Sequence, residues 1–170
     1  MSPRPGFRQV VDWRAAFLAG LFAGVGLFLL QMATTAWLLG SPWVFARMTG
    51  AMALGRDVLP PPATFDPVVV AVAFAVHMAL SFLYAALFAF IVHRGGLLLG
   101  ILGGALLGLG LYAINYFTFA AFFPWFLDLR SGLVLVLHVV FGALAGGVYE
   151  LLEVERFVPV DETAAAGGVG

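Results

Sequence analysis

The chain has 170 residues, of which 63% are hydrophobic and 10% charged, and its mean hydropathy is +1.07. Soluble domains are about 45–50% apolar, so this composition predicts an all-α protein embedded in a lipid bilayer. The formal net charge of −1 comes without a basic stripe and argues against a nucleic-acid partner, and the lack of Cys excludes disulfides and thiolate metal sites.

Four apolar segments, each near the roughly 20 residues that a helix needs to cross a bilayer, predict a four-helix transmembrane bundle over residues 15–152. We expect the spans at residues 15–40, 67–93, 96–123 and 131–152. Asp66 and Pro67 suit the start of the second span, and Ser131 suits the cap of the fourth. Residues 1–14 then form a polar arm, residues 41–66 an outer loop, and residues 153–170 a tail that we expect to be disordered.

The outer loop, residues 41–66, allows two interpretations. Its first part, from Val44 to Leu59, can form a short helix in the membrane interface, with Met48, Met52 and Leu54 toward the lipid. Such a helix would lie over the outer mouth of the bundle as a lid. In the other interpretation the loop only connects two spans.

The distribution of arginine predicts the orientation in the membrane. With four spans both termini share one side, which carries Arg4, Arg8, Arg14, Arg94 and Arg156, whereas the other side carries Arg47, Arg56 and Arg130. Because cytoplasmic segments carry an excess of basic residues, we expect the N-terminal arm and the C-terminal tail in the cytoplasm.

An internal repeat is visible when the first and third spans are aligned. Gly20 then matches Gly100 and Gly24 matches Gly104, and after two extra residues the dipeptide Pro-Trp at 42–43 meets Pro-Trp at 124–125. The sequence therefore predicts that the first and third spans are copies of one helix.

The second and fourth spans align in the same way, with His77 on His138 and Ser81 on Gly142. The repeating unit is then a two-helix hairpin. Because two spans return the chain to its starting side, the two copies are expected to be parallel and related by a pseudo-two-fold axis along the membrane normal.

Small residues recur at helical spacing and predict close contacts between helices. The third span carries a glycine at every fourth position, and helix backbones approach closely at such residues because lipid provides no hydrophobic force between helices. The glycines expected at these contacts are Gly20, Gly24, Gly96, Gly100, Gly104, Gly108, Gly142 and Gly146.

Polar side chains in the outer half of the spans form the candidate site. An intramembrane ionisable residue is a functional candidate by default, and two histidines occupy equivalent positions of the repeat. We expect both to face the bundle interior, with Asn115 as the first hydrogen-bond partner. The candidate residues are Gln31, Thr35, His77, Ser81, Asn115 and His138.

Three roles are open for this polar cluster. It can be hydrogen-bonding glue between helices, or it can line a cavity that binds a small solute or passes protons. The alternative of a different class is a b-type haem held by His77 and His138 for electron transfer. No other cofactor is predicted, and no catalytic motif or nucleophile–histidine–carboxylate set indicates an enzyme.

The combination of "LFAGVGLFLLQM", "GSPWVFARM", "LPPPATFDP", the mid-span "VH" and "FPWF" resembles that of small four-span inner-membrane proteins of proteobacteria whose activity is uncharacterised. The likeness covers most of the chain. It implies a bacterial inner membrane, and it carries over no activity and no functional residue. A second copy of the chain or another membrane protein is a possible partner beside the lipid.

Overall fold

The computed structural model describes residues 6–92 and 95–160. Arg4, Arg94 and residues 161–170, which entered the orientation and tail predictions, lie outside the described residues.

Four long apolar helices dominate the fold. They are α1 (Trp13–Leu39), α3 (Pro67–Val92), α4 (Gly96–Ile114) with its continuation to Phe122, and α6 (Gly132–Leu152). Each begins and ends within two residues of the span expected from the sequence. By length and hydropathy each is able to cross a membrane, so the chain is a four-span membrane protein in contact with the bilayer.

The ends of these helices follow from local capping. Asp12 accepts hydrogen bonds from the backbone N–H groups of Arg14 (3.0 Å) and Ala15 (3.1 Å) at the start of α1. Asp66 does the same at the start of α3, and Ser131 accepts from Val134 N at the start of α6. These side chains satisfy N–H groups that have no partner within the helix.

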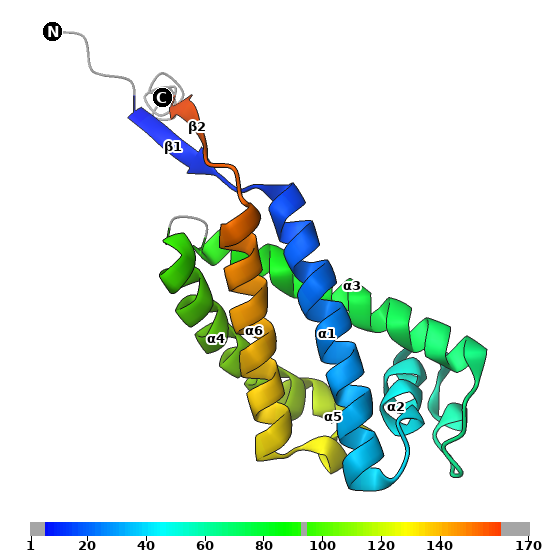
Figure 1. The fold of residues 1–170 in the computed structure, drawn as a ribbon. Helices are drawn as coiled ribbons and strands as arrows, with labels where there is room; N and C mark the ends of the chain where they lie inside the picture. Colours follow the sequence, from blue (N-terminus) through cyan, green and yellow to red (C-terminus); the bar gives the residue numbers. More distant parts are fainter. Residues whose placement is uncertain (1–5, 93–94, 161–170) are drawn as a thin grey trace, which may run out of the picture.

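The helices form one layered bundle in which α6 lies between α4 and α1, and α1 lies between α6 and α3 (Figure 1). The third span is not a continuous α-helix, because a π-helical turn, η2 (Asn115–Phe119), separates α4 from α5 (Ala120–Phe122). A 3₁₀ helix, η3 (Pro124–Leu129), then leads to α6. No pattern in the sequence indicated this π-helical turn.

The backbones of α4 and α6 are in direct contact. A Cβ at Gly104 would overlap the carbonyl oxygen of Gly142, and a Cβ at Gly142 would overlap that of Gly104. Gly100 faces Gly146 in the same manner, one turn further toward the end of the bundle that carries the chain termini. No larger residue fits between the two helices at these positions.

Gly96 differs from the other glycines of this series. We expected it at the helix contact, but it is exposed, and a Cβ there would meet nothing within 4 Å. Its φ of +70° is in the left-handed region, which favours glycine, so its role is to let the chain turn into α4.

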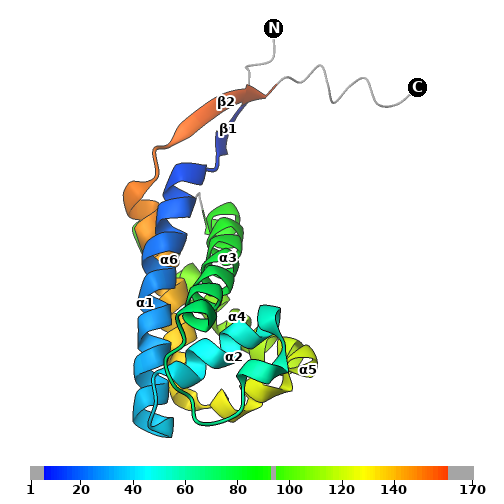
Figure 2. The same cartoon turned by 90° about the vertical axis from the view of Figure 1, so that its right-hand side faces the viewer.

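The outer loop contains a helix, α2 (Trp43–Leu54), followed by the short 3₁₀ helix η1 (Arg56–Val58). Met48, which the lid interpretation turned toward lipid, is buried against the bundle, whereas Leu54 is exposed. The reason is packing: Gly50 lies against Val69 of α3, and the Trp125 indole N–H donates to the Met48 carbonyl oxygen at 2.9 Å. Figure 2 shows α2 near α5, at the end of the bundle far from the strands.

Two short strands form an antiparallel ribbon at the opposite end: β1 (Gly6–Val10) pairs with β2 (Arg156–Val160) (Figure 1). The prediction of a disordered tail from residue 153 is therefore wrong for residues 156–160. The tail pairs with β1 from the N-terminal arm. The two strands meet because β1 precedes α1, β2 follows α6, and these two helices are neighbours.

We expect Gly104→Leu to destabilise the protein by about 1–3 kcal/mol, or to prevent folding, because α4 and α6 must separate to admit the side chain. Gly110→Leu is the matched control, since a Cβ at Gly110 of the same helix meets nothing within 4 Å. Thermal unfolding in detergent measures both. A Gly104→Leu protein that melts like the parent would contradict the packing described above.

Asp12→Asn tests the tie between the start of α1 and the end of α6. Burial raises the pKa of Asp12, but hydrogen bonds from the N–H groups of Val154, Ala15 and Arg14, with the charge of Arg156, outweigh it and lower the pKa below 3.8. A lowered pKa means that the carboxylate stabilises the fold above its unfolded-state pKa and that this contribution is lost as the pH falls through the folded-state pKa.

The parent is therefore expected to be more stable than Asp12→Asn near neutral pH, and the difference should shrink as the pH falls below about 5. Asn keeps one oxygen for the cap but loses the acceptor for the Val154 N–H, and that loss does not depend on pH. The pH dependence of the difference therefore reports the charge. The measurement is the pH dependence of the melting temperature of both proteins in detergent. A difference that stays constant over this range would show that the charge of Asp12 contributes nothing.

Candidate functional site

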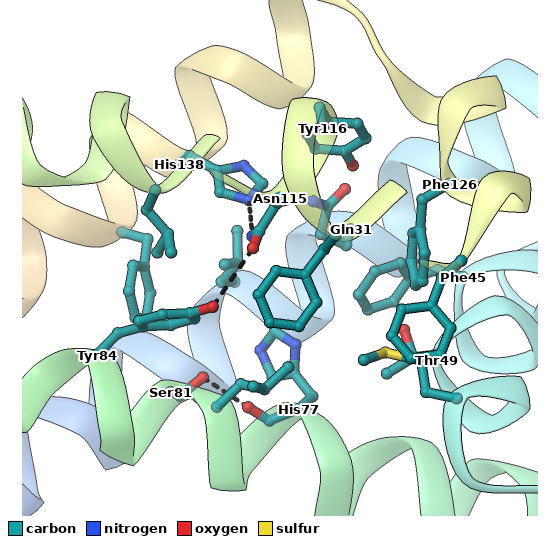
Figure 3. Close-up of a pocket in the computed structure, with 17 residues that line it drawn as sticks. Gln31, Phe45, Thr49, His77, Ser81, Tyr84, Asn115, Tyr116, Phe126 and His138 are labelled. Atoms are coloured by element: carbon teal, nitrogen blue, oxygen red, sulfur yellow. Dashed lines mark hydrogen bonds between the residues drawn. The ribbon is translucent and has the colours of Figure 1, made fainter. Parts of the chain in front are cut away.

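A cavity of about 90 Å³ lies between the helices, near the end that carries α2. All four spanning segments and α2 contribute to its wall (Figure 3). Most of the wall is apolar and aromatic. Its polar and aromatic members include Gln31, Phe45, Thr49, His77, Ser81, Tyr84, Asn115, Tyr116, Phe119, Phe126, His138 and Phe141.

His77 links α3 to α1. Its Nε2 lies 2.9 Å from the carbonyl oxygen of Gly24, and because a carbonyl only accepts, the ring proton is on Nε2. The rings of Phe28 and Phe45 meet the imidazole edge-on, with centroids at 5.2 Å and 5.9 Å. The absence of a side chain at Gly24 is what exposes this carbonyl to α3, since a Cβ there would collide with Ser81.

His138 belongs to a second network, which joins α6, η2 and α3. Its Nδ1 donates to the Val134 carbonyl oxygen at 2.8 Å, so its Nε2 accepts from the Asn115 amide at 3.2 Å. The Tyr84 hydroxyl in turn donates to Asn115 Oδ1 at 3.4 Å. Figure 3 shows this chain of hydrogen bonds along one wall of the cavity.

The π-helical turn explains the position of Asn115. Asn115 is the first residue of η2, where the wider turn changes the direction in which side chains leave the helix. Such turns occur often at functional sites. Tyr116, the next residue, is also buried in the wall, and its ring contacts His138 with centroids 5.8 Å apart.

Two further candidates have local partners. The Ser81 hydroxyl donates to the His77 carbonyl oxygen, one turn earlier in α3, at 2.9 Å. Thr35 is fully buried, and its hydroxyl lies 3.1 Å from the Met32 carbonyl oxygen and 3.3 Å from that of Pro42. Thr35 therefore fixes the connection between α1 and α2 and is not part of the cavity wall.

Gln31 and Thr49 each carry a buried oxygen without a hydrogen-bond partner among the described residues. They are 2% and 3% exposed, and no described residue forms a hydrogen bond with Gln31 Oε1 or Thr49 Oγ1. A buried polar atom without a partner costs about 1–3 kcal/mol. Both atoms belong to residues of the same cavity wall, so a hydrogen-bonding occupant would remove the cost at both.

Sequence reasoning missed the contribution of α2, which supplies Phe45 and Thr49 to the wall. A signal was present: Ala46 and Gly50 are four residues apart, the spacing used for the glycines of the third span. Ala46 is fully buried, and Gly50 packs on α3. Tyr84 and the aromatic residues of the wall were missed because an aromatic residue in an apolar span carries no mark of its direction.

The chemistry of the wall limits what it can hold. The residues that line the cavity include no Arg, Lys, Asp or Glu. Within the described residues there is also no group of three or more His, Cys, Asp or Glu side chains able to hold a metal ion. The wall therefore offers hydrogen bonds and aromatic surfaces, which suit a neutral occupant.

A haem does not fit the site as it is built. Both ring nitrogens of His138 and the Nε2 of His77 are already hydrogen-bonded. The cavity of about 90 Å³ is also well below the roughly 300–1,000 Å³ of pockets for ligands of drug size, and the macrocycle is larger still. Both histidines line one cavity, but each holds a different pair of helices.

Comparisons with protein-family models, with curated proteins and with solved structures found no match to this chain. The resemblance to small inner-membrane proteins thus has no identified homologue behind it. Its four long apolar helices make this chain a multi-pass membrane protein with two buried histidines.

Proposed function

We propose that this protein binds a small, neutral, hydrogen-bonding solute, or a cluster of water molecules, in the membrane-embedded cavity. The observation that carries the proposal is the pair of unpartnered atoms, Gln31 Oε1 and Thr49 Oγ1, on one cavity wall. Gln31 Oε1 accepts one hydrogen bond from the occupant, and the Thr49 hydroxyl donates or accepts a second.

The volume of the cavity and the lack of charged side chains in its wall limit which molecules it can bind. A water molecule needs at least about 10–15 Å³ of such volume, so 90 Å³ holds several waters or one solute with a few heavy atoms. The absence of charged side chains from the wall disfavours ions, because nothing compensates for their desolvation.

The two histidine networks act as the frame of this site. His77 ties α3 to α1, and His138 with Asn115 ties α6 to η2, so these hydrogen bonds set the spacing of the helices around the cavity. Passage of protons has less support. The chain from Tyr84 through Asn115 and His138 ends on the Val134 carbonyl within α6, which leads to no further acceptor.

The duplicated hairpin is part of the proposal, and its support is a matched register of contacts. In the first hairpin Gly20 meets Ala85 and Gly24 meets Ser81. The aligned positions in the second hairpin also meet, Gly100 with Gly146 and Gly104 with Gly142. Contacts at aligned positions of both hairpins are what a duplication predicts, and they support this part of the proposal.

The chain is further proposed to lie in a bacterial inner membrane, with the ribbon end in the cytoplasm and the cavity toward the outer side. The excess of arginine at the ribbon end supports this orientation. A second copy or another membrane protein as a partner stays a prediction.

Gln31→Leu and Thr49→Val test whether the cavity is occupied, because an occupied and a dry cavity predict opposite changes in the free energy of unfolding. If an occupant satisfies these side chains, each substitution removes a hydrogen bond and lowers the free energy of unfolding by about 0.5–1.5 kcal/mol. If the cavity is dry, each substitution removes an unsatisfied polar group and raises that free energy.

The measurement is thermal unfolding in detergent, with Thr118→Val as the control because Thr118 is exposed. A shared occupant also predicts that the double variant loses less stability than the sum of the two single variants. Two stabilised single variants would overturn the proposal.

A further inference from the structure

A second pocket, of about 440 Å³, lies where the ribbon meets the ends of α1 and α6. It is distinct from the interior cavity and shares no residue with it. Its wall is formed by Val10, Val11, Asp12, Trp13, Arg14, Ala15, Leu18, Leu152, Val154 and Arg156. Segments from both ends of the chain therefore build one site at the end of the spans.

Two cations converge in this pocket. Arg14 comes from the first turn of α1 and Arg156 from the start of β2. Within residues 6–92 and 95–160, no residue accepts a hydrogen bond from either guanidinium group, although the charge of Arg156 acts on Asp12. Asp12 in the same wall keeps its negative charge while its oxygens accept from the N–H groups of Arg14, Ala15 and Val154. Two arginines and one aspartate leave the wall with one excess positive charge.

The remaining wall is apolar, and it faces the place where a lipid would lie. Leu18 lies in the second turn of α1, and Leu152 is the last residue of α6. Trp13 is 62% exposed beside them, and tryptophan is favoured at the level of lipid headgroups. A ligand in this pocket thus meets cations above an apolar surface.

We propose that this pocket binds the phosphodiester of an anionic phospholipid, with Arg14 and Arg156 on the phosphate oxygens and the acyl chains along Trp13 and Leu18. Arginine suits this role because its planar guanidinium group donates two parallel hydrogen bonds to phosphate. Basic pockets at the ends of spans are a known form of lipid headgroup recognition. Free phosphate carries the same anionic group and could contact the same arginines, but only a lipid would also fill the apolar part of the wall.

The test compares lipid binding to the purified full-length protein in a neutral detergent, by native mass spectrometry. The probes are dioleoyl phosphatidylglycerol, dioleoyl phosphatidylcholine and inorganic phosphate. The test variant is the double substitution Arg14→Gln and Arg156→Gln. The two single substitutions are measured as well, and Arg130→Gln is their matched control, since it removes one positive charge at the opposite end of the bundle.

The parent and the control are expected to bind phosphatidylglycerol in preference to phosphatidylcholine. The double variant should bind phosphatidylglycerol roughly thirtyfold more weakly, since each basic residue near an anionic lipid contributes about a factor of five. If the double variant does not fold, the test rests on the single variants Arg14→Gln and Arg156→Gln. It then also rests on the preference of the parent for phosphatidylglycerol over phosphatidylcholine.

Equal binding of the two lipids by the parent would overturn the proposal, as would an unchanged preference in the double variant. Displacement of phosphatidylglycerol by millimolar inorganic phosphate, with no preference between the lipids, would assign the site to free phosphate and would also overturn it.

Discussion

The close approach of α4 and α6 is the constraint on which the rest of this structure depends. In a bilayer the hydrophobic effect does not drive helices together, so contact between them must come from packing and hydrogen bonds. Glycines at 104 and 142 remove every side chain from the contact, and each backbone lies against the other. This contact sets the depth of η2 relative to α6 and so places Asn115 within reach of His138.

The polar interior divides into two parts once the helices are placed. His77, His138, Ser81 and Thr35 have partners in the protein, and these partners join or stiffen helices. Gln31 Oε1 and Thr49 Oγ1 have no hydrogen-bond partner among the described residues, although both side chains are as deeply buried. The proposed occupant of the cavity would supply partners to these two atoms.

Much of the fold could be predicted from the sequence, because the signals that define a membrane span are local. Length, hydropathy and caps such as Asp66 and Ser131 determine where each helix begins and ends. What escaped prediction depends on contacts between distant segments. The strand at Arg156–Val160 needs its partner from the N-terminal arm, and the burial of Met48 needs Val69 and Trp125.

The candidate site shows the same limit. Histidine, asparagine and glutamine stand out in an apolar span, so His77, His138, Asn115 and Gln31 could be found in the sequence. Thr49 was missed because the helix of the outer loop was expected in the membrane interface and not in the bundle. Thr35 was selected for its polarity, although its hydroxyl binds the carbonyl oxygens of Met32 and Pro42 and does not line the cavity. The polarity of a residue can be read from the sequence, whereas its place in a cavity wall depends on contacts between distant segments.

An experimental structure at a resolution that shows ordered water tests the central claim most directly. The occupied cavity predicts density within hydrogen-bond distance of both Gln31 Oε1 and Thr49 Oγ1, from water molecules or a bound solute. A cavity without density, or one filled by the side chains of its own wall, would contradict it.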